Sequence, residues 1–255
     1  MHPNLDPARF GDNPSAGGYA AINGTTLYFE IYGKGEPLLL LHGNGGSMST
    51  FSAQLEAFAT GYRVIGLDSR CQGKSGEREG PLLETLHYQQ MADDVEALLR
   101  HKGWGRVRVV GWSDGGIVGL VLARQAPDLV AALAISGANL VSDNSAFDQE
   151  LLDAVESVVA NPATPAWDRA LNRMMRDEPN LAFEDLASIV CPTLVMAGDR
   201  DLIRIEHTVR IAQAIPGAQL CIFPAADHGF FQSDAELFNQ VVLRFLRADS
   251  QATTG

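Results

Sequence analysis

The chain has 255 residues, 46% of them hydrophobic, and its 19 basic and 31 acidic side chains give a formal net charge of -12. This length and apolar content suffice for one large α/β domain. A surface this acidic repels nucleic-acid phosphates and anionic lipid. No apolar run approaches the roughly 20 residues that a bilayer span requires. We therefore expect neither nucleic acid nor a membrane as a partner.

The beginning of the chain and its cysteines bear on where the protein works. Residues 1–18 are rich in Pro, Gly, Asn and Asp and lack the apolar centre of a signal peptide, so we interpret them as a flexible N-terminal arm on the surface. Cys71, Cys191 and Cys221 are widely spaced and form no CxxC pattern. This pattern is typical of reduced thiols rather than of a disulfide framework, and it favours a cytoplasmic protein.

Patterns of strand and helix then alternate along the chain. Asn23-Gly24 predicts a hairpin, because both turn positions need positive φ. Buried apolar runs predict further strands, and apolar residues three and four apart predict helices. The expected strands cover residues 19–22, 26–32, 37–41, 62–67, 107–110, 129–135, 192–197 and 219–223. The expected helices cover residues 50–59, 88–101, 117–124, 205–215 and 235–246.

This alternation is interrupted between residues 140 and 187, where two amphipathic helical patterns and a short third one follow each other. Strands separated by helices imply a mostly parallel sheet with right-handed crossovers, and the opening hairpin supplies an antiparallel edge. We therefore predict an α/β fold with a doubly wound, mostly parallel eight-stranded sheet. Residues 19–139 and 188–248 form its core, and residues 140–187 form a small helical cap.

Residues 111–116 read Gly-Trp-Ser-Asp-Gly-Gly and fit G-x-S-x-G, the sharp strand-to-helix turn that presents a serine in a strained conformation. Small residues flank the serine because a bulky Cβ would clash with the neighbouring helix and strand. An apolar strand pattern precedes the motif and a helical pattern follows it. This context favours Ser113 as a nucleophile over an ordinary serine at a helix N-terminus.

A serine hydroxyl is a poor nucleophile at neutral pH, so Ser113 needs a base, and the base needs a group that orients it. His228 follows the last predicted strand, and Asp201 follows the strand before it. Both therefore sit at carboxyl ends of strands, where open α/β sheets gather their sites. Without this motif set His228 would be interpreted as a surface histidine. Asp199 competes with Asp201 for the acid, because either could cap the following loop.

With these residues the chain resembles the α/β-hydrolase family, in which serine, acid and histidine follow each other in this order. More narrowly, it is similar to compact-cap serine hydrolases of the biphenyl-hydrolase-like and meta-cleavage-product hydrolase type, from about residue 19 to 246. The family's HG-x-x-G loop corresponds to residues 42–46. The resemblance implies that the backbone N–H groups of Asn44 and Asp114 form the oxyanion hole, that Asp201 is the acid, and that His42 braces the loop.

A further family pattern, D-x-R-G-x-G-x-S, corresponds to residues 68–75, with Cys71 where glycine is usual. We assign this segment a structural role, and the cysteine leaves the local loop shape in question.

Asp114 has two interpretations. A carboxylate in the first turn of a helix interacts favourably with the macrodipole. The same carboxylate would lie close to the reacting carbonyl and would attract a cationic substrate group such as an α-amino group. Both interpretations stay open, and Asp114 is therefore also a candidate substrate-binding residue.

The remaining histidines and the large apolar residues of the cap carry no motif. We expect surface positions for His2, His87, His101 and His207. Trp167, Met174 and Met175 are expected in the core rather than in the pocket lining. Some apolar cap residues must still face the site, because the acyl group has to be shielded from water.

These residues predict a serine hydrolase that uses no cofactor and cleaves a small carboxylic ester through an acyl-enzyme, with an amide or a thioester as alternatives. C–C bond hydrolysis, perhydrolysis and aminopeptidase action use the same residues and stay open, as does a receptor of this fold without turnover. In the resembling family the serine excludes the dehalogenase and epoxide-hydrolase variants, which use an aspartate nucleophile. The sequence contains no H-E-x-x-H, Cys/His cluster, G-x-G-x-x-G or Walker loop, so it implies no metal and no nucleotide.

Overall fold

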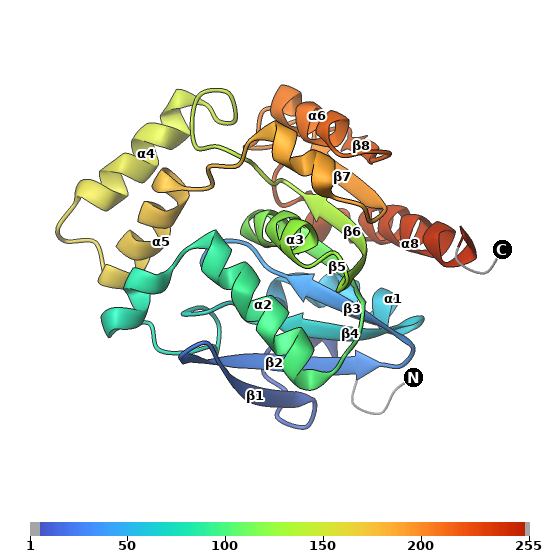
Figure 1. The fold of residues 1–255 in the computed structure, drawn as a ribbon. Helices are drawn as coiled ribbons and strands as arrows, with labels where there is room; N and C mark the ends of the chain where they lie inside the picture. The colour runs from blue at the N-terminus through green and yellow to red at the C-terminus, as the bar shows by residue number, and fades with distance from the viewer. Residues whose placement is uncertain (1–5, 253–255) are drawn as a thin grey trace.

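The computed structural model describes residues 6–252, which build one eight-stranded sheet with helices on both faces (Figure 1). The strands are β1 (Gly17–Ile22), β2 (Thr25–Gly33), β3 (Glu36–Leu41), β4 (Tyr62–Leu67), β5 (Val107–Trp112), β6 (Val130–Ser136), β7 (Thr193–Gly198) and β8 (Gln219–Phe223). Their order across the sheet is β1-β2-β4-β3-β5-β6-β7-β8. β2 pairs antiparallel with β1 and β4, and every other pairing is parallel. The predicted fold class is confirmed.

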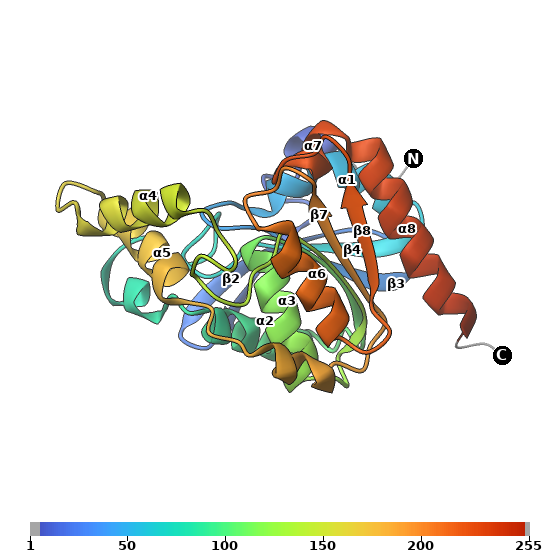
Figure 2. The same cartoon turned by 90° about the horizontal axis from the view of Figure 1, so that it is seen from above.

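Helices cover the two faces of this sheet (Figure 2). On one face lie α1 (Ser52–Ala59), α8 (Ala235–Ala252) and the short α7 (Phe230–Ser233), and on the other lie α2 (Tyr88–Lys102), α3 (Asp114–Gln125) and α6 (Ile205–Ala214). β3 shows why both faces need cover. Leu38 and Leu40 pack into the core beneath α1 and α8, whereas their neighbours along the strand pack beneath α2 and α3. A strand buried on both faces reads as a continuous apolar run because successive side chains point to opposite sides.

The segment between β6 and β7 carries α4 (Gln149–Ala160), α5 (Ala166–Asp177) and the 3₁₀ helix η4 (Phe183–Ser188). α4 and α5 pack against each other and lie beside the sheet rather than on it (Figures 1 and 2). The indole Nε1 of Trp167 in α5 donates to the backbone oxygen of Cys71 at 2.5 Å, just beyond the carboxyl end of β4. Contacts of this kind hold the segment over the edge where the parallel strands end.

The N-terminal segment differs from the prediction. Phe10 is only 3% exposed and packs against the aromatic residues beneath α1. The backbone N–H groups of Gly11 and Asn13 donate to the buried carboxylate of Glu30 at 2.9 and 2.8 Å. The predicted flexible arm is therefore wrong for residues 10–13, which are held by Glu30 and the aromatic core, and for residues 17–18, which belong to β1. Residues 1–5 of that arm lie outside the described residues.

His207 also differs from the prediction, since it is 1% exposed rather than on the surface. It lies in α6, and its Nε2 accepts the backbone N–H of Leu140 at 3.0 Å where the α4–α5 segment begins. Burial lowers the pKa of its imidazole, so the ring is neutral at this junction. His87 and His101 are exposed as expected, and His2 lies outside the described residues.

No helix in the described part of the chain combines the length and the apolar character that crossing a bilayer demands.

Candidate active site

Ser113 stands alone between the end of β5 and the start of α3, with φ 55° and ψ −121°. A non-glycine residue in such a conformation costs on the order of 1–3 kcal/mol, so the surrounding structure must hold it. Its backbone N–H donates to the carbonyl of Ser136 in β6 at 2.8 Å, and its own carbonyl accepts the N–H of Gly116 at 2.8 Å. The turn that the motif predicts is therefore present, and it lifts Ser113 out of the sheet.

The two glycines of the motif have different close neighbours. A Cβ atom on Gly115 would lie 2.0 Å from the backbone oxygen of Leu41, and one on Gly111 would lie 2.3 Å from the backbone oxygen of Gly115. Neither contact can relax, because both neighbours are backbone atoms. The expected clash with the adjacent strand and helix is confirmed.

His228 and Asp201 form a directed pair in the loops that follow β8 and β7. Nδ1 of His228 lies 2.6 Å from Oδ1 of Asp201, whose side chain is fully buried. The same carboxylate oxygen also accepts the N–H of Ile203 at 3.1 Å, which fixes its orientation. Because a carboxylate only accepts, Nδ1 carries the proton and Nε2 keeps its lone pair. The imidazole is therefore held in the tautomer that a base requires.

The structure separates the two candidate acids. Asp199 is exposed and accepts the N–H of Ala226 at 3.1 Å, and its backbone hydrogen bonds with Ala225 and Ala226 lower its pKa. It caps the loop after β8 and does not pair with His228. Asp201 is the acid that contacts the imidazole.

Ser113 and His228 line one cavity of about 190 Å³. Asn44 and Asp114, the candidate oxyanion-hole residues, line it as well. Asp114 is the first residue of α3, so its N–H has no carbonyl in a preceding helical turn and is available to a ligand. The apolar wall of this cavity consists of Phe147, Leu151, Met175, Leu202 and Ile203.

His42 stabilises the HG-x-x-G loop that carries Asn44. Nδ1 of His42 donates to the backbone oxygen of Gly43 at 2.7 Å, and Nε2 accepts the N–H of Ser69 at 3.0 Å. Complete burial lowers the pKa of this imidazole, which keeps it neutral and able to accept. His42 therefore links two loops at the site.

The carboxyl group of Asp114 is buried behind the nucleophile. Its Oδ1 accepts the hydroxyl of Tyr88 at 2.9 Å, whereas Oδ2 has no hydrogen-bond partner among the described residues. Burial raises the pKa of Asp114 to about 6, against the opposing influence of Tyr88, Asn44 and the charge of His228. The Asn44 amide is close enough to contribute, although its Nδ2 does not meet hydrogen-bond geometry with Oδ2. Asn44 Nδ2 and Asp114 Oδ2 are thus a buried donor and a buried acceptor near each other, in two residues that line the cavity.

Tyr88 is a site residue that sequence reasoning missed. It begins α2, and its backbone N–H donates to the carboxylate of Glu178 at 3.0 Å. Nδ1 of the exposed His87 lies 2.5 Å from the same carboxylate. Glu178 directly follows α5, and its carboxylate caps the first residue of α2. The end of α5 therefore helps to hold Tyr88 where its hydroxyl bonds to Asp114. No local pattern marks Tyr88, because its partners lie 26 and 90 positions away.

Gly137 was missed as well. It follows β6 with φ 63°, and a Cβ atom there would lie 2.6 Å from Cε1 of His228. Glycine is thus required for the imidazole to occupy its place next to Asp201. Its position after a strand that ends beside the nucleophile is the only signal in the sequence.

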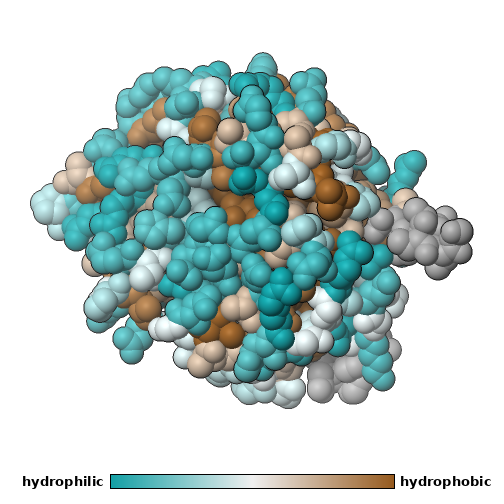
Figure 3. Space-filling model, in the orientation of Figure 1, coloured by the Kyte–Doolittle hydropathy of each residue, from teal (hydrophilic) through white to brown (hydrophobic). Residues whose placement is uncertain are grey.

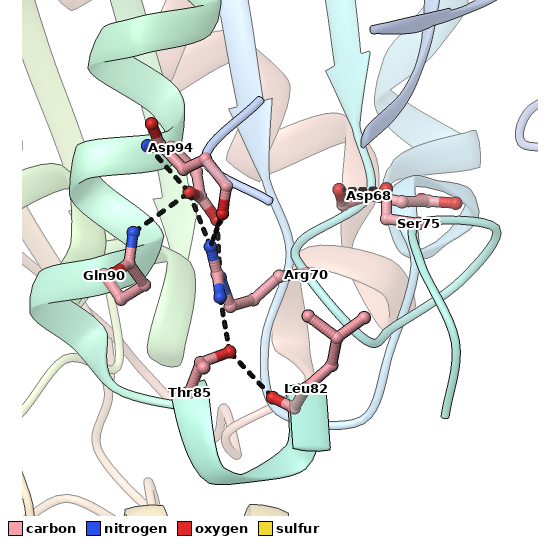
Figure 4. A network of polar contacts seen from close by, with 8 residues as sticks. Asp68, Arg70, Ser75, Leu82, Thr85, Gln90 and Asp94 are labelled. Atoms are coloured by element: carbon pink, nitrogen blue, oxygen red, sulfur yellow. Dashed lines mark hydrogen bonds and ion pairs between the residues drawn. The ribbon is translucent and has the colours of Figure 1, made fainter. Parts of the chain in front are cut away.

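The D-x-R segment takes part in a network of polar contacts with α2 and the segment before it (Figure 4). Arg70 donates from Nε and Nη2 to Asp94 in α2 at 2.6 and 2.7 Å, and a further nitrogen contacts Thr85. Ser75 Oγ donates to the backbone oxygen of Asp68 at 2.6 Å. The expected structural role is supported by these contacts. Cys71 has φ 57°, a conformation that glycine adopts at lower cost, which explains why glycine is usual there.

The apolar residues of the α4–α5 segment divide between core and cavity. Met174 is buried at 3% exposure, as expected for a core residue. The expectation is wrong for Met175, which lines the cavity with Ser113 and His228. Successive residues of one helix point to different sides, so only one of the two methionines can face the core. Among the described residues no group of three His, Cys, Asp or Glu side chains is placed to hold a metal ion.

Comparison with known proteins places this geometry in a family. Residues 36–176 match the family model described as alpha/beta hydrolase fold, and the chain belongs to this family. It is 32% identical to the putative carbamate hydrolase RutD of Rhizobium rhizogenes, over 88% of this chain and 99% of that protein. It is 26% identical to the serine hydrolase BPHL of Homo sapiens, over 96% of this chain and 91% of that protein.

A solved structure gives the same result. A thermophilic esterase from Thermogutta terrifontis superposes with a TM-score of 0.75 at 26% identity, covering 91% of this chain and 97% of that one. The predicted resemblance to α/β-hydrolases is confirmed, and the protein is a serine hydrolase of this fold.

Proposed function

We propose that the protein hydrolyses a small carboxylic ester with Ser113 as the nucleophile, His228 as the base and Asp201 as the acid that orients it. The observation that carries this proposal is the shared cavity. It is lined by a serine in a strained turn and by an imidazole whose Nδ1 is 2.6 Å from a buried carboxylate. A strained serine and a single imidazole tautomer are what nucleophilic acyl transfer requires.

In the first half of the reaction, Nε2 of His228 takes the proton of the Ser113 hydroxyl as its oxygen attacks the substrate carbonyl. The imidazolium then gives that proton to the leaving alcohol, and an ester of Ser113 remains. In the second half, His228 takes a proton from water as the water oxygen attacks the acyl-enzyme. The imidazolium returns that proton to the Ser113 oxygen as the bond to the acyl group breaks, which frees the acid and restores the hydroxyl. Asp201 keeps its charge throughout and stabilises the imidazolium.

We assign the oxyanion hole to the backbone N–H groups of Asn44 and Asp114, which line the same cavity as Ser113. Negative charge develops on the carbonyl oxygen in both halves of the reaction. Two fixed donors stabilise it, and the loss of one such donor typically costs about 10²–10³ in rate.

We further propose that the Asp114 carboxylate attracts a cationic group next to the scissile carbonyl. The place of Asp114 in the lining of the cavity at Ser113 favours this role over a purely helix-stabilising one, because a helix dipole alone does not require the residue to line a cavity. The test compares an aminoacyl ester with its uncharged analogue in wild type and in Asp114→Asn. Selective loss of the aminoacyl ester is expected, and an equal response of both esters would contradict the proposal.

Residues 140–187 would act as a cap over this cavity, since Phe147, Leu151 and Met175 supply its apolar wall. Shielding of the acyl-enzyme from bulk water is the expected effect. We place the reaction in the cytoplasm, because all three cysteines are free thiols. The net charge of -12 makes nucleic acid an unfavourable partner.

A carbamate is the second candidate substrate, favoured by the relationship to RutD and by the side chains of Asn44 and Asp114, which both line the cavity. An amide donor beside a carboxylate acceptor matches the C=O and the N–H of a carbamate. Equal or higher kcat/KM for an alkyl carbamate than for the matching ester would select this candidate. C–C bond hydrolysis, perhydrolysis and amide hydrolysis would use the same three residues.

The primary test is turnover of p-nitrophenyl acetate and its loss in Ser113→Ala. A fluorophosphonate probe should label wild type at Ser113 and leave the alanine variant unlabelled. Tight ligand binding with no more than one turnover would instead identify a receptor of this fold and overturn the proposal.

A further inference from the structure

A second cavity lies beside the candidate active site, between α4 and α5. Its volume is about 280 Å³, which exceeds the 190 Å³ of the cavity at Ser113. Phe147, Leu151 and Met175 line both cavities. These three residues therefore form a boundary that the two cavities share.

The partition between the cavities is apolar and adaptable. Met175 is half-buried, and its unbranched thioether side chain changes rotamer more easily than a branched one. Leu151 is half-buried as well. A substrate group that displaces the end of Met175 would join the two spaces.

The residues that line the α4–α5 cavity differ in polarity and exposure. Among its lining residues Val155 is buried and Leu152 is half-buried, whereas Asp153 and Glu156 are exposed and therefore lie toward its outer end. Arg176 also lines it, but its guanidinium is paired with Asp177 at 2.7 Å and with Glu156 at 3.4 Å. The inner part thus favours an apolar group, and its charges are kept to the outer end.

The sizes of the two spaces support a joint use. Sites for small organic ligands are typically about 300–1,000 Å³. The cavity at Ser113 is smaller than this range by itself, and it reaches the range when the α4–α5 cavity is added.

We propose that the α4–α5 cavity is a subsite for an apolar arm of the substrate, entered past Phe147, Leu151 and Met175. This inference rests on the proposed ester hydrolysis and defines its substrate class as esters with an extended alkyl or aryl group. That group can belong to the acyl part or to the alcohol part, and the two ester series described below distinguish them.

The test measures kcat/KM for p-nitrophenyl esters from acetate to octanoate and for the acetates of ethanol to octanol. Each methylene that enters an apolar subsite raises kcat/KM up to roughly fourfold. The series in which kcat/KM rises identifies the part of the substrate that enters. Leu152→Trp fills only the α4–α5 cavity. It should lower the kcat/KM of the octanoate ester relative to the acetate ester at least tenfold, or, if the alcohol part enters, the kcat/KM of octyl acetate relative to ethyl acetate.

Two further variants keep the test decisive. Val158→Trp places the same large side chain at a half-buried position of α4 that lines neither cavity, and it should retain the wild-type ratio. Leu152→Ala enlarges the α4–α5 cavity and should move the optimum to a longer chain. A wild-type ratio in folded Leu152→Trp, or an equal fall in Val158→Trp, would overturn the subsite.

Binding without turnover separates this inference from the proposed function. In Ser113→Ala, p-nitrophenyl octanoate should bind at least tenfold more tightly than the acetate ester, and addition of Leu152→Trp should remove this difference. If wild type hydrolyses no ester but this binding difference is found, ester hydrolysis fails and the subsite stands. If esters are hydrolysed and no binding difference exists in either series, the subsite fails and ester hydrolysis stands.

Discussion

The indole Nε1 of Trp112 donates a hydrogen bond to the backbone oxygen of His228 at 2.8 Å, and the two rings lie 5.2 Å apart. Phe231 packs on the same indole with ring centroids 4.9 Å apart. The residue directly before the nucleophile therefore holds the loop that carries the proposed base. Trp112 is a positioning residue, because it acts on the reaction through His228.

We predict that Trp112→Phe lowers kcat/KM for p-nitrophenyl acetate by roughly 3- to 10-fold, the value of one lost hydrogen bond of about 0.5–1.5 kcal/mol. The phenyl ring keeps much of the packing, so the fall should come with a changed pH profile rather than with unfolding. Rates measured from pH 5.5 to 9 together with the thermal unfolding midpoint test this. An unchanged pH profile would show that the indole does not position His228.

Asp201→Asn should reduce kcat on the order of 10⁴-fold, because the amide can donate to Nδ1 and stabilise the wrong tautomer of His228. Asp199→Asn is the matched control, since Asp199 is exposed and its side chain accepts hydrogen bonds from the loop after β8. It should change kcat less than twofold. A comparable loss in both variants, measured by stopped assays at pH 7.5, would contradict the assignment of the acid.

The raised pKa of Asp114, about 6, gives stability a defined pH dependence. The folded state favours the neutral carboxyl, so this contribution is complete below the ordinary pKa near 3.8 and is lost as pH rises through 6. The unfolding free energy of Asp114→Asn minus that of wild type should therefore be larger at pH 7.5 than at pH 4, by up to about 3 kcal/mol. Urea unfolding at both pH values measures it, and a difference independent of pH would show that Asp114 ionises normally.

Gly137→Ala should lower kcat/KM at least about 10²-fold, a loss typical of misplaced catalytic groups, because its Cβ atom would displace the His228 ring. Gly217→Ala is the control for backbone strain alone. Gly217 has a similar positive φ, 70° against 63°, and a Cβ atom there meets nothing within 4 Å. Both variants should lose stability, but only Gly137→Ala should lose activity, and equal kcat/KM in the two would contradict this role.

Arg70→Met leaves the buried carboxylate of Asp94 without its charged partner and should lower the unfolding free energy by about 3–5 kcal/mol. The double variant Arg70→Met/Asp94→Leu removes both charges and should recover most of that loss. Chemical denaturation of the three proteins provides the comparison. If the double variant is no more stable than the single one, the unpaired charge is not the cause.

The features that could be predicted from the sequence are those set by local patterns. The strand-turn-helix unit around Ser113 was recognisable because its glycines, apolar strand and helix are contiguous. β4 and β8 were predicted with their observed bounds, because both are ended by turn residues. The position of His228 followed from the order of the strands that precede it.

The features that could not be predicted depend on partners distant in the chain. Phe10 and Asn13 look like parts of a loose segment until Glu30 and the aromatic core are present. His207 and Tyr88 are buried by contacts with Leu140 and Asp114 that no local spacing reveals. The assignment of Met174 to the core and Met175 to the cavity needs the helix orientation, which only the packed α4–α5 pair defines.

The exposure of the Ser113 hydroxyl depends on the unusual backbone conformation of this residue. Its angles are maintained by a bond to β6 and by the closeness of Leu41 to Gly115, and both neighbours belong to other strands. A synthetic peptide with the same hexapeptide would relax into an ordinary extended or helical shape. The reactivity of this hydroxyl is thus a property of the assembled sheet, and it should appear and disappear together with cooperative folding.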